Sequence, residues 1–337
     1  MSGGLSRHTT LLEKQRAKNN NLIYVDNGGL FASPSENDQE VLARVGLNID
    51  SSNGLDAMNL SPREFYFGLQ YLADRAKEIS FPFISTNISS KVAMPWLKKY
   101  IIKNVGKQKV AILGILPENA FTSNFVTIES PAKAIKSTIS EIKDQANIFI
   151  LLSQLNAEET ANIVKEIPEI NLAVAHSEEE LCKMTDNTSQ IIVPNSVSGK
   201  FFLSADISVD GKGKIKVSQN TPVLLDDSIE HVTAVDAMIM TSLKEAQEKR
   251  ITAFREASEH LKQPGTTAIK PMNKDEFFAA VNKKKAELKA LRPEEGEEVK
   301  AKLLLDGQEI PATIRKVPRK VDDSEKSQPG ESKEMAQ

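Results

Sequence analysis

The chain has 337 residues, of which 40% are hydrophobic and 26% are charged, and its formal net charge is −3. This small charge indicates neither a nucleic acid nor an anionic membrane as a partner. The single cysteine, Cys182, excludes an intrachain disulfide and a zinc site built from cysteines. No apolar run approaches the roughly 20 residues of a transmembrane helix, and no signal peptide is recognisable. The sequence as it stands predicts a cytoplasmic protein, and a missing N-terminal leader would change this to a periplasmic or extracytoplasmic one.

From Gly3 to about Leu225, short apolar segments alternate with helical patterns, which is typical of an α/β domain. The rhythm changes at 191–217, where the pattern predicts successive antiparallel strands with a hairpin turn at 209–214. Before that change, we expect buried strands in the segments 81–88, 109–116, 147–156 and 170–177, and in 22–31 a buried strand that runs into a Gly-containing turn.

Two helices of this region carry recognisable start signals. Pro131 favours the first turn of a helix, and apolar residues follow it at helical spacing up to Ala146. Asn156 with Glu159 three residues later has the pattern of a capping box. Both patterns place a helix between two predicted strands, as an α/β domain requires.

The remainder of the chain differs from the α/β domain at 1–227. A long helix is predicted at 228–264, with an apolar stripe that begins at Val232. A shorter helix and a β-hairpin around Asp306 follow within 265–317. The last segment, 318–337, is low in hydrophobicity and is predicted to be disordered.

Seven segments occur in an order shared with a known family. They read GGLSRHTTLLEKQR, YVDNGGLF, LDAMNLSPREFYFGL, FPFISTNI, VAILGI, ILLSQLN and AVAHSEEE. In this order they resemble the calcineurin-like metallophosphoesterases, and more specifically the bacterial 5'-nucleotidase and UDP-sugar hydrolase branch. The resemblance implies an α/β/β/α sandwich of two mixed sheets flanked by helices, to which the rest of the chain adds a mostly helical appendage. It also implies two divalent metals that activate a water molecule for phosphoester hydrolysis.

The positions that carry this chemistry in the family hold other residues here. Gly29 stands where the resemblance places the bridging aspartate, and Pro62 stands where it places a metal-binding asparagine. Arg63 replaces the histidine that protonates the leaving group, and an arginine stays protonated near neutral pH. Tyr66 replaces the aspartate that supports this histidine, and Gln154 replaces a histidine ligand. The domain at 1–227 is therefore identified as a degenerate member of the family.

Some polar residues of the motifs remain. Asp26 matches the first aspartate of the Asp-x-Gly-Asp turn, although a structural role at a strand end is the simpler interpretation. Glu64 lies inside the replaced segment. His176 keeps part of a Gly-His-Ser-His loop, and a solvated loop histidine is again the simpler interpretation. The family also has a strand ending in Asp-x-His before the Gly-Gly-Leu helix, and here the chain starts almost at Gly3.

We expect a non-catalytic, metallophosphatase-like protein that serves as a binding or assembly subunit and needs no cofactor. Its partners would be proteins, and a structural subunit would expose an apolar surface on the long helix or on the 298–317 hairpin. The alternative is a metal-dependent phosphoesterase with an altered centre around Asp26, Glu64 and His176, which would bind manganese, zinc or calcium. This alternative requires the three side chains to converge within coordination distance of one ion.

Overall fold

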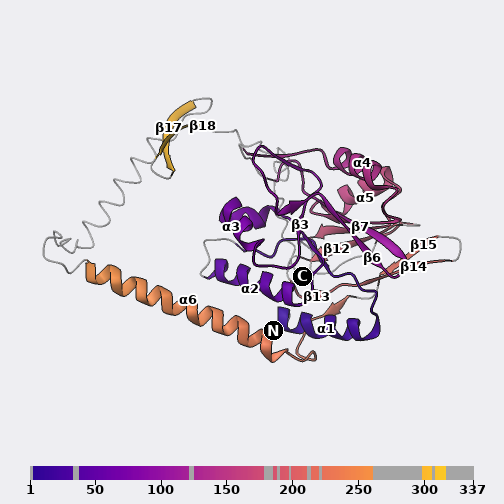
Figure 1. The fold of residues 1–337 in the computed structure, drawn as a ribbon, viewed down its shortest axis with the longest axis horizontal. Helices are drawn as coiled ribbons and strands as arrows, with labels where there is room; N and C mark the ends of the chain where they lie inside the picture. The colour runs from indigo at the N-terminus through magenta and orange to yellow at the C-terminus, as the bar shows by residue number, and fades with distance from the viewer. Residues whose placement is uncertain are drawn as a thin grey trace, which may run out of the picture. The chain divides into compact units, whose positions relative to one another are not determined.

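The computed structural model describes residues 3–32, 38–120, 125–177, 185–187, 190–196, 199–210, 214–219, 222–260, 298–305 and 308–315. The chain divides into two compact units, Met1–Glu256 and Ala257–Gln337, of which the first contains both large sheets (Figure 1). The four-segment division expected from the sequence remains a prediction. In the part of the chain that the structure describes, no helix is both long and apolar enough to cross a membrane.

Two sheets form the centre of the first unit. The four-stranded sheet has the order β1-β2-β3-β5, and all of its pairs are parallel. Its strands are β1 (Val25–Asp26), β2 (Ala57–Asn59), β3 (Phe83–Ile84) and β5 (Leu97–Lys98). The six-stranded sheet has the order β11-β12-β10-β9-β7-β6 and is mixed, because its outer pairs β6–β7 and β11–β12 are antiparallel. Its strands are β6 (Tyr100–Val105), β7 (Gln108–Ile115), β9 (Ile148–Ser153), β10 (Leu172–Ser177), β11 (Thr185–Asn187) and β12 (Gln190–Ser196).

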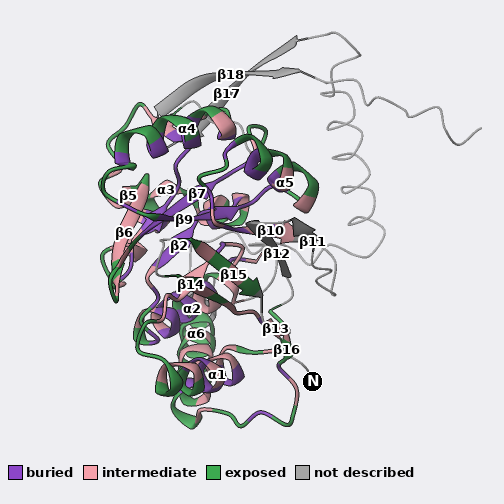
Figure 2. Ribbon diagram, turned by 90° about the vertical axis from the view of Figure 1, so that its right-hand side faces the viewer, coloured by how far each residue is buried: buried purple, intermediate pink, exposed green. Residues whose placement is uncertain are grey.

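Helices cover the outer faces of both sheets. On the six-stranded sheet these are α4 (Pro131–Ile142) and α5 (Ala157–Glu166), which pack on buried side chains of β7 and β9 (Figure 2). On the four-stranded sheet these are α2 (Gln39–Ser52) and α3 (Gly68–Arg75), which share a core with β2 and β3. The predicted α/β/β/α sandwich is confirmed. The other described helices are α1 (Leu5–Lys18), the 3-10 helix η1 (Pro62–Phe67) and α6 (Thr233–His260), of which the last four residues belong to the second unit.

The period of two in the strands distributes apolar side chains to both faces of the six-stranded sheet. In β9, Ile148, Ile150 and Leu152 point into the core between the two sheets, whereas Phe149 and Leu151 point toward α4 and α5. A strand that is buried on both faces must be apolar along its whole length. This explains why residues 148–152 of β9 form an uninterrupted apolar run.

The helix signals read from the sequence are confirmed. Pro131 is the first residue of α4, and the apolar stripe of this helix faces the core. Asn156 caps α5, because its side chain accepts a hydrogen bond from the N–H of Glu159 while the Glu159 carboxylate accepts one from the N–H of Asn156.

Three strand predictions need correction. The segment 22–31 contains only the two-residue strand β1, and the segment 81–88 is interrupted between β3 and β4 (Ile88–Ser90). The interruption arises because Asn87 turns its amide toward the main chain of Leu116 and Glu129 instead of continuing the strand. Within 191–217, β12 pairs parallel with β10, because its apolar run completes the central sheet.

The smaller hairpins agree with the sequence. The strands β14 (Ala205–Val209) and β15 (Ile215–Gln219) pair antiparallel across the predicted turn, and β17 (Glu298–Leu305) pairs antiparallel with β18 (Gln308–Arg315) in the second unit. Two further antiparallel pairs are β4 with β8 (Val126–Ile128) and β13 (Phe201–Phe202) with β16 (Val223–Leu224). The predicted helix within 265–317, the tail 318–337 and Cys182 lie outside the described residues.

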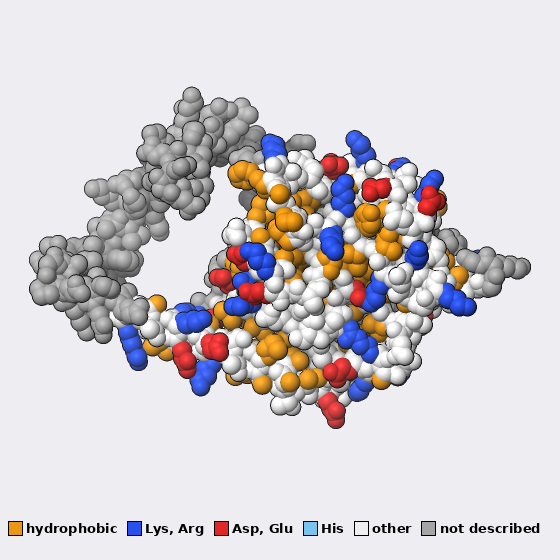
Figure 3. All heavy atoms as spheres, in the orientation of Figure 1, with side chains coloured by type: hydrophobic (Ala, Val, Ile, Leu, Met, Phe, Trp, Pro, Cys, Tyr) orange, Lys and Arg blue, Asp and Glu red, His pale blue; other side chains and the backbone are white. Residues whose placement is uncertain are grey.

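Charged side chains of both signs are interspersed on the face of the molecule drawn in Figure 3. Apolar side chains also appear there, and on α6 Met240 has an exposed fraction of 67%. The interspersed charges agree with the small net charge of the chain.

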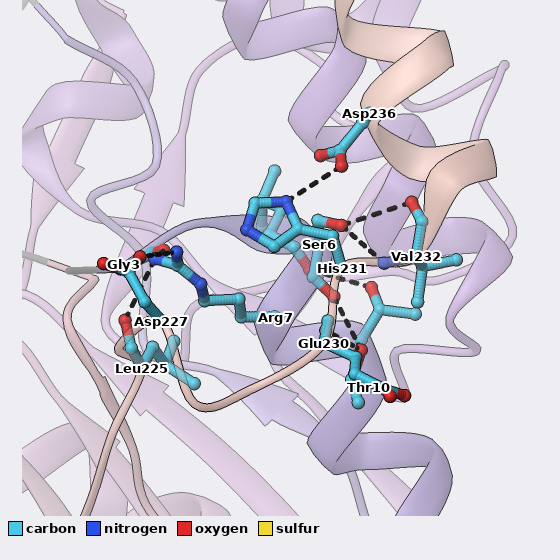
Figure 4. Close-up of polar contacts among 12 residues, drawn as sticks. Gly3, Ser6, Arg7, Thr10, Leu225, Asp227, Glu230, His231, Val232 and Asp236 are labelled. Atoms are coloured by element: carbon cyan, nitrogen blue, oxygen red, sulfur yellow. Dashed lines mark hydrogen bonds and ion pairs between the residues drawn. The ribbon is translucent and has the colours of Figure 1, made fainter. Parts of the chain in front are cut away.

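Several polar side chains of the N-terminal helix α1 contact the segment before α6 (Figure 4). The Ser6 hydroxyl accepts a hydrogen bond from the N–H of Val232 at 2.7 Å and donates one to its carbonyl at 3.2 Å. Thr10 donates to the carbonyl of Glu230 at 2.6 Å, and Arg7 forms an ion pair with Asp227. Each contact uses a side chain on the buried face of α1, which explains why this face is rich in serine and threonine.

We predict that Ser6→Ala lowers the free energy of unfolding by about 1–3 kcal/mol, because it leaves two half-buried main-chain groups of Val232 without their partner. Ser52→Ala is the matched control, because Ser52 is a helical serine whose hydroxyl makes an exposed hydrogen bond to the carbonyl of Asn48. Urea unfolding of both variants measures the difference. Equal losses in the two variants would contradict the structural role of Ser6.

Candidate functional site

The candidate site lies where the carboxyl ends of parallel strands from both sheets come together. The turn 27–29 follows β1, the segment 60–64 follows β2, and Gln154 follows β9. In open α/β sheets, polar groups that follow the strands meet at this edge and form the usual position of a site. Contacts between the three segments show that they meet here as well.

The side chain of Glu64 holds two of these segments together. Its carboxylate accepts hydrogen bonds from the N–H of Ser61 at 2.8 Å and from the N–H of Gly29 at 3.0 Å. A third, longer bond comes from the N–H of Phe31 at 3.4 Å. Glu64 is fully buried, and the Ser61 hydroxyl in turn accepts a bond from the N–H of Arg63, so that the start of η1 forms a capping box. Both oxygens of the carboxylate are therefore used by the main chain.

The two glycines of the turn are required for different reasons. Gly28 has a φ of 84°, and a Cβ atom there would lie 2.5 Å from the carbonyl oxygen of Asn59, so β2 approaches too closely for any side chain. Gly29 has a φ of 91° and open space around it. At Gly29 the backbone conformation, and not crowding, disfavours a side chain. An aspartate at position 29, as the resemblance requires, does not suit this backbone.

A network of buried amides occupies the space between the strands. The side-chain amide of Asn59 donates to the Asn27 side chain at 3.1 Å and to the carbonyls of Ile115 and Leu152, each at 3.2 Å. Asn27 donates to the carbonyl of Ser153 at 2.8 Å and receives a hydrogen bond on its own carbonyl from Gln154. These amides link β1, β2, β7 and β9, because each strand end contributes a carbonyl or a side chain.

Asn59 also explains the glycine at position 114. A Cβ atom at Gly114 would lie 2.2 Å from Oδ1 of Asn59, so no other residue fits beside the fully buried asparagine. This oxygen is buried and has no hydrogen-bond partner among the described residues. Its contact with Gly114 brings β2 of one sheet against β7 of the other.

The structure places the sequence-predicted residues in two groups. Asp26, Gly29, Glu64 and Gln154 are part of the joined segments. Pro62 begins η1, whereas Arg63 and Tyr66 are exposed on it, and Tyr66 has an exposed fraction of 47%. His176 lies near the end of β10, where its N–H donates to the carbonyl of Leu155 at 2.9 Å.

These residues do not fit a two-metal centre. Gly29 and Pro62 provide no ligand atom, Gln154 uses its amide nitrogen to donate to Asn27, and both oxygens of Glu64 accept main-chain N–H groups. Across the described ranges, no three His, Cys, Asp or Glu side chains lie close enough to hold a metal ion. Asp26, Glu64 and His176 therefore do not form the altered centre that the alternative hypothesis requires.

The sequence interpretation missed the asparagines of this site. Asn27 and Asn59 each stand at or just beyond the end of a strand, and each is less than 5% exposed. Their position in the sequence could have identified them as site residues, because a polar residue between an apolar strand and a turn lies at the carboxyl edge of a parallel sheet. The motifs drew attention instead to the residues that had replaced metal ligands.

Burial controls the ionisation of the acidic groups near the turn. It raises the pKa of Glu64 and of Asp26, against the effect of the main-chain N–H groups that each carboxylate accepts. Burial also raises the pKa of Asp50 to about 7, and the charge of Asp26 adds to this effect. The Tyr24 hydroxyl donates to Asp50 at 2.6 Å and acts on this pKa in the opposite direction. Burial lowers the pKa of His8 to about 4.

We predict that Glu64→Ala lowers the free energy of unfolding by about 3 kcal/mol or more, because three main-chain N–H groups lose their acceptor. The neighbouring variant Arg63→Ala changes an exposed side chain, so we expect a change within about 0.5 kcal/mol. Urea unfolding at neutral pH distinguishes the two variants. A Glu64→Ala protein as stable as Arg63→Ala would show that the carboxylate does not hold the segments together.

A second prediction concerns pH. The folded protein keeps a proton on Asp50 up to a pH of about 7, whereas the unfolded chain releases this proton near the ordinary value of 3.8. The contribution of Asp50 to the free energy of unfolding therefore falls as pH rises from about 4 to about 7. His8 acts oppositely, because the unfolded chain takes up its proton near 6.5 and the folded chain only near 4. We therefore expect Asp50→Asn to gain stability relative to the wild type by about 2 kcal/mol or more as pH rises from about 4.5 to about 8.

Urea unfolding across this range measures the effect of Asp50→Asn. The control is Asp144→Asn, which changes an exposed carboxyl just after α4 and should give a curve parallel to that of the wild type. A curve for Asp50→Asn that runs parallel to that of the wild type would contradict the raised pKa of Asp50.

No family model matches the chain. It is 25% identical over 271 residues to snake venom 5'-nucleotidase from Naja atra, covering 70% of this chain and 50% of the relative. It is 26% identical over 270 residues to the 2',3'-cyclic-nucleotide 2'-phosphodiesterase/3'-nucleotidase of Haemophilus influenzae, covering 66% and 41% of the two chains. The chain thus spans about half the length, or less, of these relatives.

Solved structures show the same fold. Sulfate thiohydrolase SoxB from Thermus thermophilus superposes with a TM-score of 0.64 at 18% identity, covering 73% of this chain and 48% of that chain. A 5'-nucleotidase precursor from the same species also gives 0.64, at 16% identity, with coverages of 73% and 54%. The calcineurin-like phosphoesterase YfkN from Bacillus subtilis gives 0.59 at 18% identity, with coverages of 74% and 90%. In sequence the chain is thus similar to 5'-nucleotidases and nucleotide phosphodiesterases, and in fold it is similar to solved 5'-nucleotidase and calcineurin-like phosphoesterase structures.

Proposed function

We propose that the chain is a non-catalytic relative of the 5'-nucleotidases that acts by binding, as a subunit of a larger assembly. The observation that carries this proposal is the buried Glu64 carboxylate, which is committed to the main-chain N–H groups of Gly29, Phe31 and Ser61. A carboxylate used in this way stabilises the protein and is not available to a metal or a substrate.

The amide network supports the same interpretation. Asn59 donates its side-chain N–H groups to the side-chain oxygen of Asn27 and to main-chain carbonyls, whereas Asn27 and Gln154 donate theirs to main-chain carbonyls. An asparagine or glutamine coordinates a cation through its side-chain oxygen, and the oxygen of Asn27 already accepts a hydrogen bond from Asn59. The strand ends are thus joined by neutral hydrogen bonds, in the place where a two-metal hydrolase needs anionic and imidazole ligands.

Exposed apolar side chains on α6 favour a role in assembly. Met240 is 67% exposed and Ile251 is 43% exposed, whereas Val235 near the start of the helix is buried against α2. One part of α6 therefore packs on the first unit, and side chains further along it are open to a partner.

A metal-dependent phosphoesterase with a centre around Asp26, different from the one expected around Asp26, Glu64 and His176, is the second candidate. It is favoured by the names of the relatives, which are nucleotidases and nucleotide phosphodiesterases. Such a centre would depend on Asp26. The carboxylate of Asp26 accepts one main-chain hydrogen bond, from the N–H of Gly28 at 2.6 Å, whereas the carboxylate of Glu64 accepts several.

The two candidates differ in metal content and turnover. We expect the purified chain to retain less than one equivalent of manganese, zinc or calcium after dialysis, as measured by mass spectrometry of the metals. We also expect no hydrolysis of AMP, of 2',3'-cyclic AMP or of p-nitrophenyl phosphate above that of the Asp26→Ala variant, which serves as the control for contaminating phosphatases. Stoichiometric metal with turnover that requires both the metal and Asp26 would overturn the proposal.

A further inference from the structure

The strand β6 forms one outer edge of the six-stranded sheet. It pairs with β7 and has no second neighbour among the described strands. Figure 2 draws β6 at the outside of the first unit, and its residues are half-buried except for the exposed Asn104. Main-chain N–H and C=O groups at such an edge can pair with a strand of another chain. The edge of β6 can therefore accept a protein segment in an extended conformation.

The sequence around β6 is basic. From residue 79 to residue 117 the chain contains six lysines and no aspartate or glutamate. The whole chain has a net charge of −3, so the remainder of the chain is acidic overall. In Figure 3, Lys and Arg side chains lie over the region where Figure 1 draws β6. Positive charge is thus concentrated in the stretch of sequence that contains this edge.

Four of these lysines flank the ends of β6. Lys98 and Lys99 come directly before the strand. Lys107 lies in the turn after it, and Lys109 stands opposite Asn104 on β7. All four residues are exposed, and none of them forms an ion pair within the described part of the chain. Their charges are therefore available to a partner at both ends of the strand.

Between these lysines, the strand itself is mostly apolar. Tyr100 and Ile102 pack on the core beneath α4 and α5, and Ile101 and Val105 pack on the core between the two sheets. Lys103, the one charged residue of the strand, is already in an ion pair. Because the apolar side chains are only half-buried, a strand added beside β6 would cover them further on both faces.

The lysines disfavour a second copy of this edge as the occupant. Two β6 edges side by side would bring lysines of both chains together, and like charges that face each other destabilise a pair of strands. A segment with carboxylates at its ends would instead be attracted at both ends of β6. A membrane surface could contact the lysines but would leave the main-chain groups of β6 unpaired. The edge and its charges together fit an acidic polypeptide.

We propose that the edge of β6 binds an extended segment of a partner protein, which has a β-branched centre of about five residues and acidic residues at both ends. The main chain of the segment pairs with β6, and its carboxylates lie beside the lysines before and after the strand. This inference supplies the partner for the binding role proposed above and rests on that proposal only for the claim that binding is the function.

The test uses the full chain and synthetic peptides that carry an N-terminal fluorophore. The first peptide has alternating valine and threonine over five residues, between two pairs of glutamates. The second has proline in place of the central residue, which disfavours strand pairing. In the third, lysines replace the four glutamates. Fluorescence anisotropy should show saturable binding of the first peptide and at least tenfold weaker binding of the other two.

Charge reversal locates the binding at β6. The double variant Lys99→Glu, Lys107→Glu changes an exposed lysine at each end of the strand and should weaken binding of the first peptide at least tenfold. The same variant should bind the third peptide more tightly than the wild type does, because the charges again complement each other. Lys165→Glu is the control, because Lys165 is exposed on α5, which contacts β10 and β12, and it should leave binding unchanged.

Amide hydrogen exchange of the wild-type chain tests the strand pairing without any substitution. In an edge strand the N–H groups of alternate residues point outward, since the others bond to the neighbouring strand. The first peptide should therefore slow exchange at alternate positions within residues 100–105. Unchanged exchange at these positions while the peptide is bound would contradict pairing with β6.

Several other outcomes would overturn the inference. Equal binding of the first and second peptides would show attraction between charges without a strand. Absence of binding would leave the lysines only a role against the pairing of edges. Binding of phosphatidylserine vesicles that the double variant abolishes, without binding of the first peptide, would assign the lysines to a membrane surface. These results are independent of the metal and turnover measurements, because a chain that hydrolyses AMP and also binds the first peptide contradicts only the proposed lack of catalysis.

Discussion

The burial of the Glu64 carboxylate is the constraint on which the site depends. Three main-chain N–H groups from two loops end at this side chain, in a place that excludes water. Main-chain donors in such a place need an acceptor, and removing the acceptor costs more than the hydrogen bonds contribute. The conformation of the turn after β1, the start of η1 and the close approach of Gly28 to β2 all follow from where this carboxylate is held.

Uncharged side-chain amides make the other hydrogen bonds between the strand ends. Asn59 reaches carbonyls of β7 and β9 from the other sheet, and its neighbour Gly114 leaves room for it. Amides can satisfy carbonyls of several strands without bringing a net charge into the core, so no counter-ion is needed there. A fold that ordinarily surrounds charged metals can in this way be closed by hydrogen bonds alone.

Much of the architecture was predictable from the sequence because the signals were local. Pro131 and the Asn156–Glu159 pair mark helix starts through their own chemistry, and both helices begin where these residues indicate. The long apolar runs of β7 and β9 were equally clear. The interruption of the segment 81–88 was not predictable, because it depends on carbonyls of Leu116 and Glu129 that are distant in the chain.

The position of the site could be predicted from the sequence, but the contacts made by its side chains could not. The motif order brought attention to Gly29, Glu64 and Gln154, and the structure joins their segments. The role of Glu64 as an acceptor for main-chain groups could not be read from the sequence, since it requires the N–H of Gly29 to point toward η1 from another strand. Asn27 and Asn59 were missed for the same reason, because a buried amide is recognised by its partners and not by its neighbours in the sequence.

The positive φ of Gly29 has a consequence for how such a chain can change during evolution. A mutation to aspartate at this position would restore the side chain that the resemblance implies, yet the aspartate would enter a backbone conformation that costs a non-glycine residue about 1–2 kcal/mol. Its N–H would also still be directed at Glu64. A carboxylate ligand at position 29 therefore requires the turn and its carboxylate support to change together, so a single substitution there does not produce one.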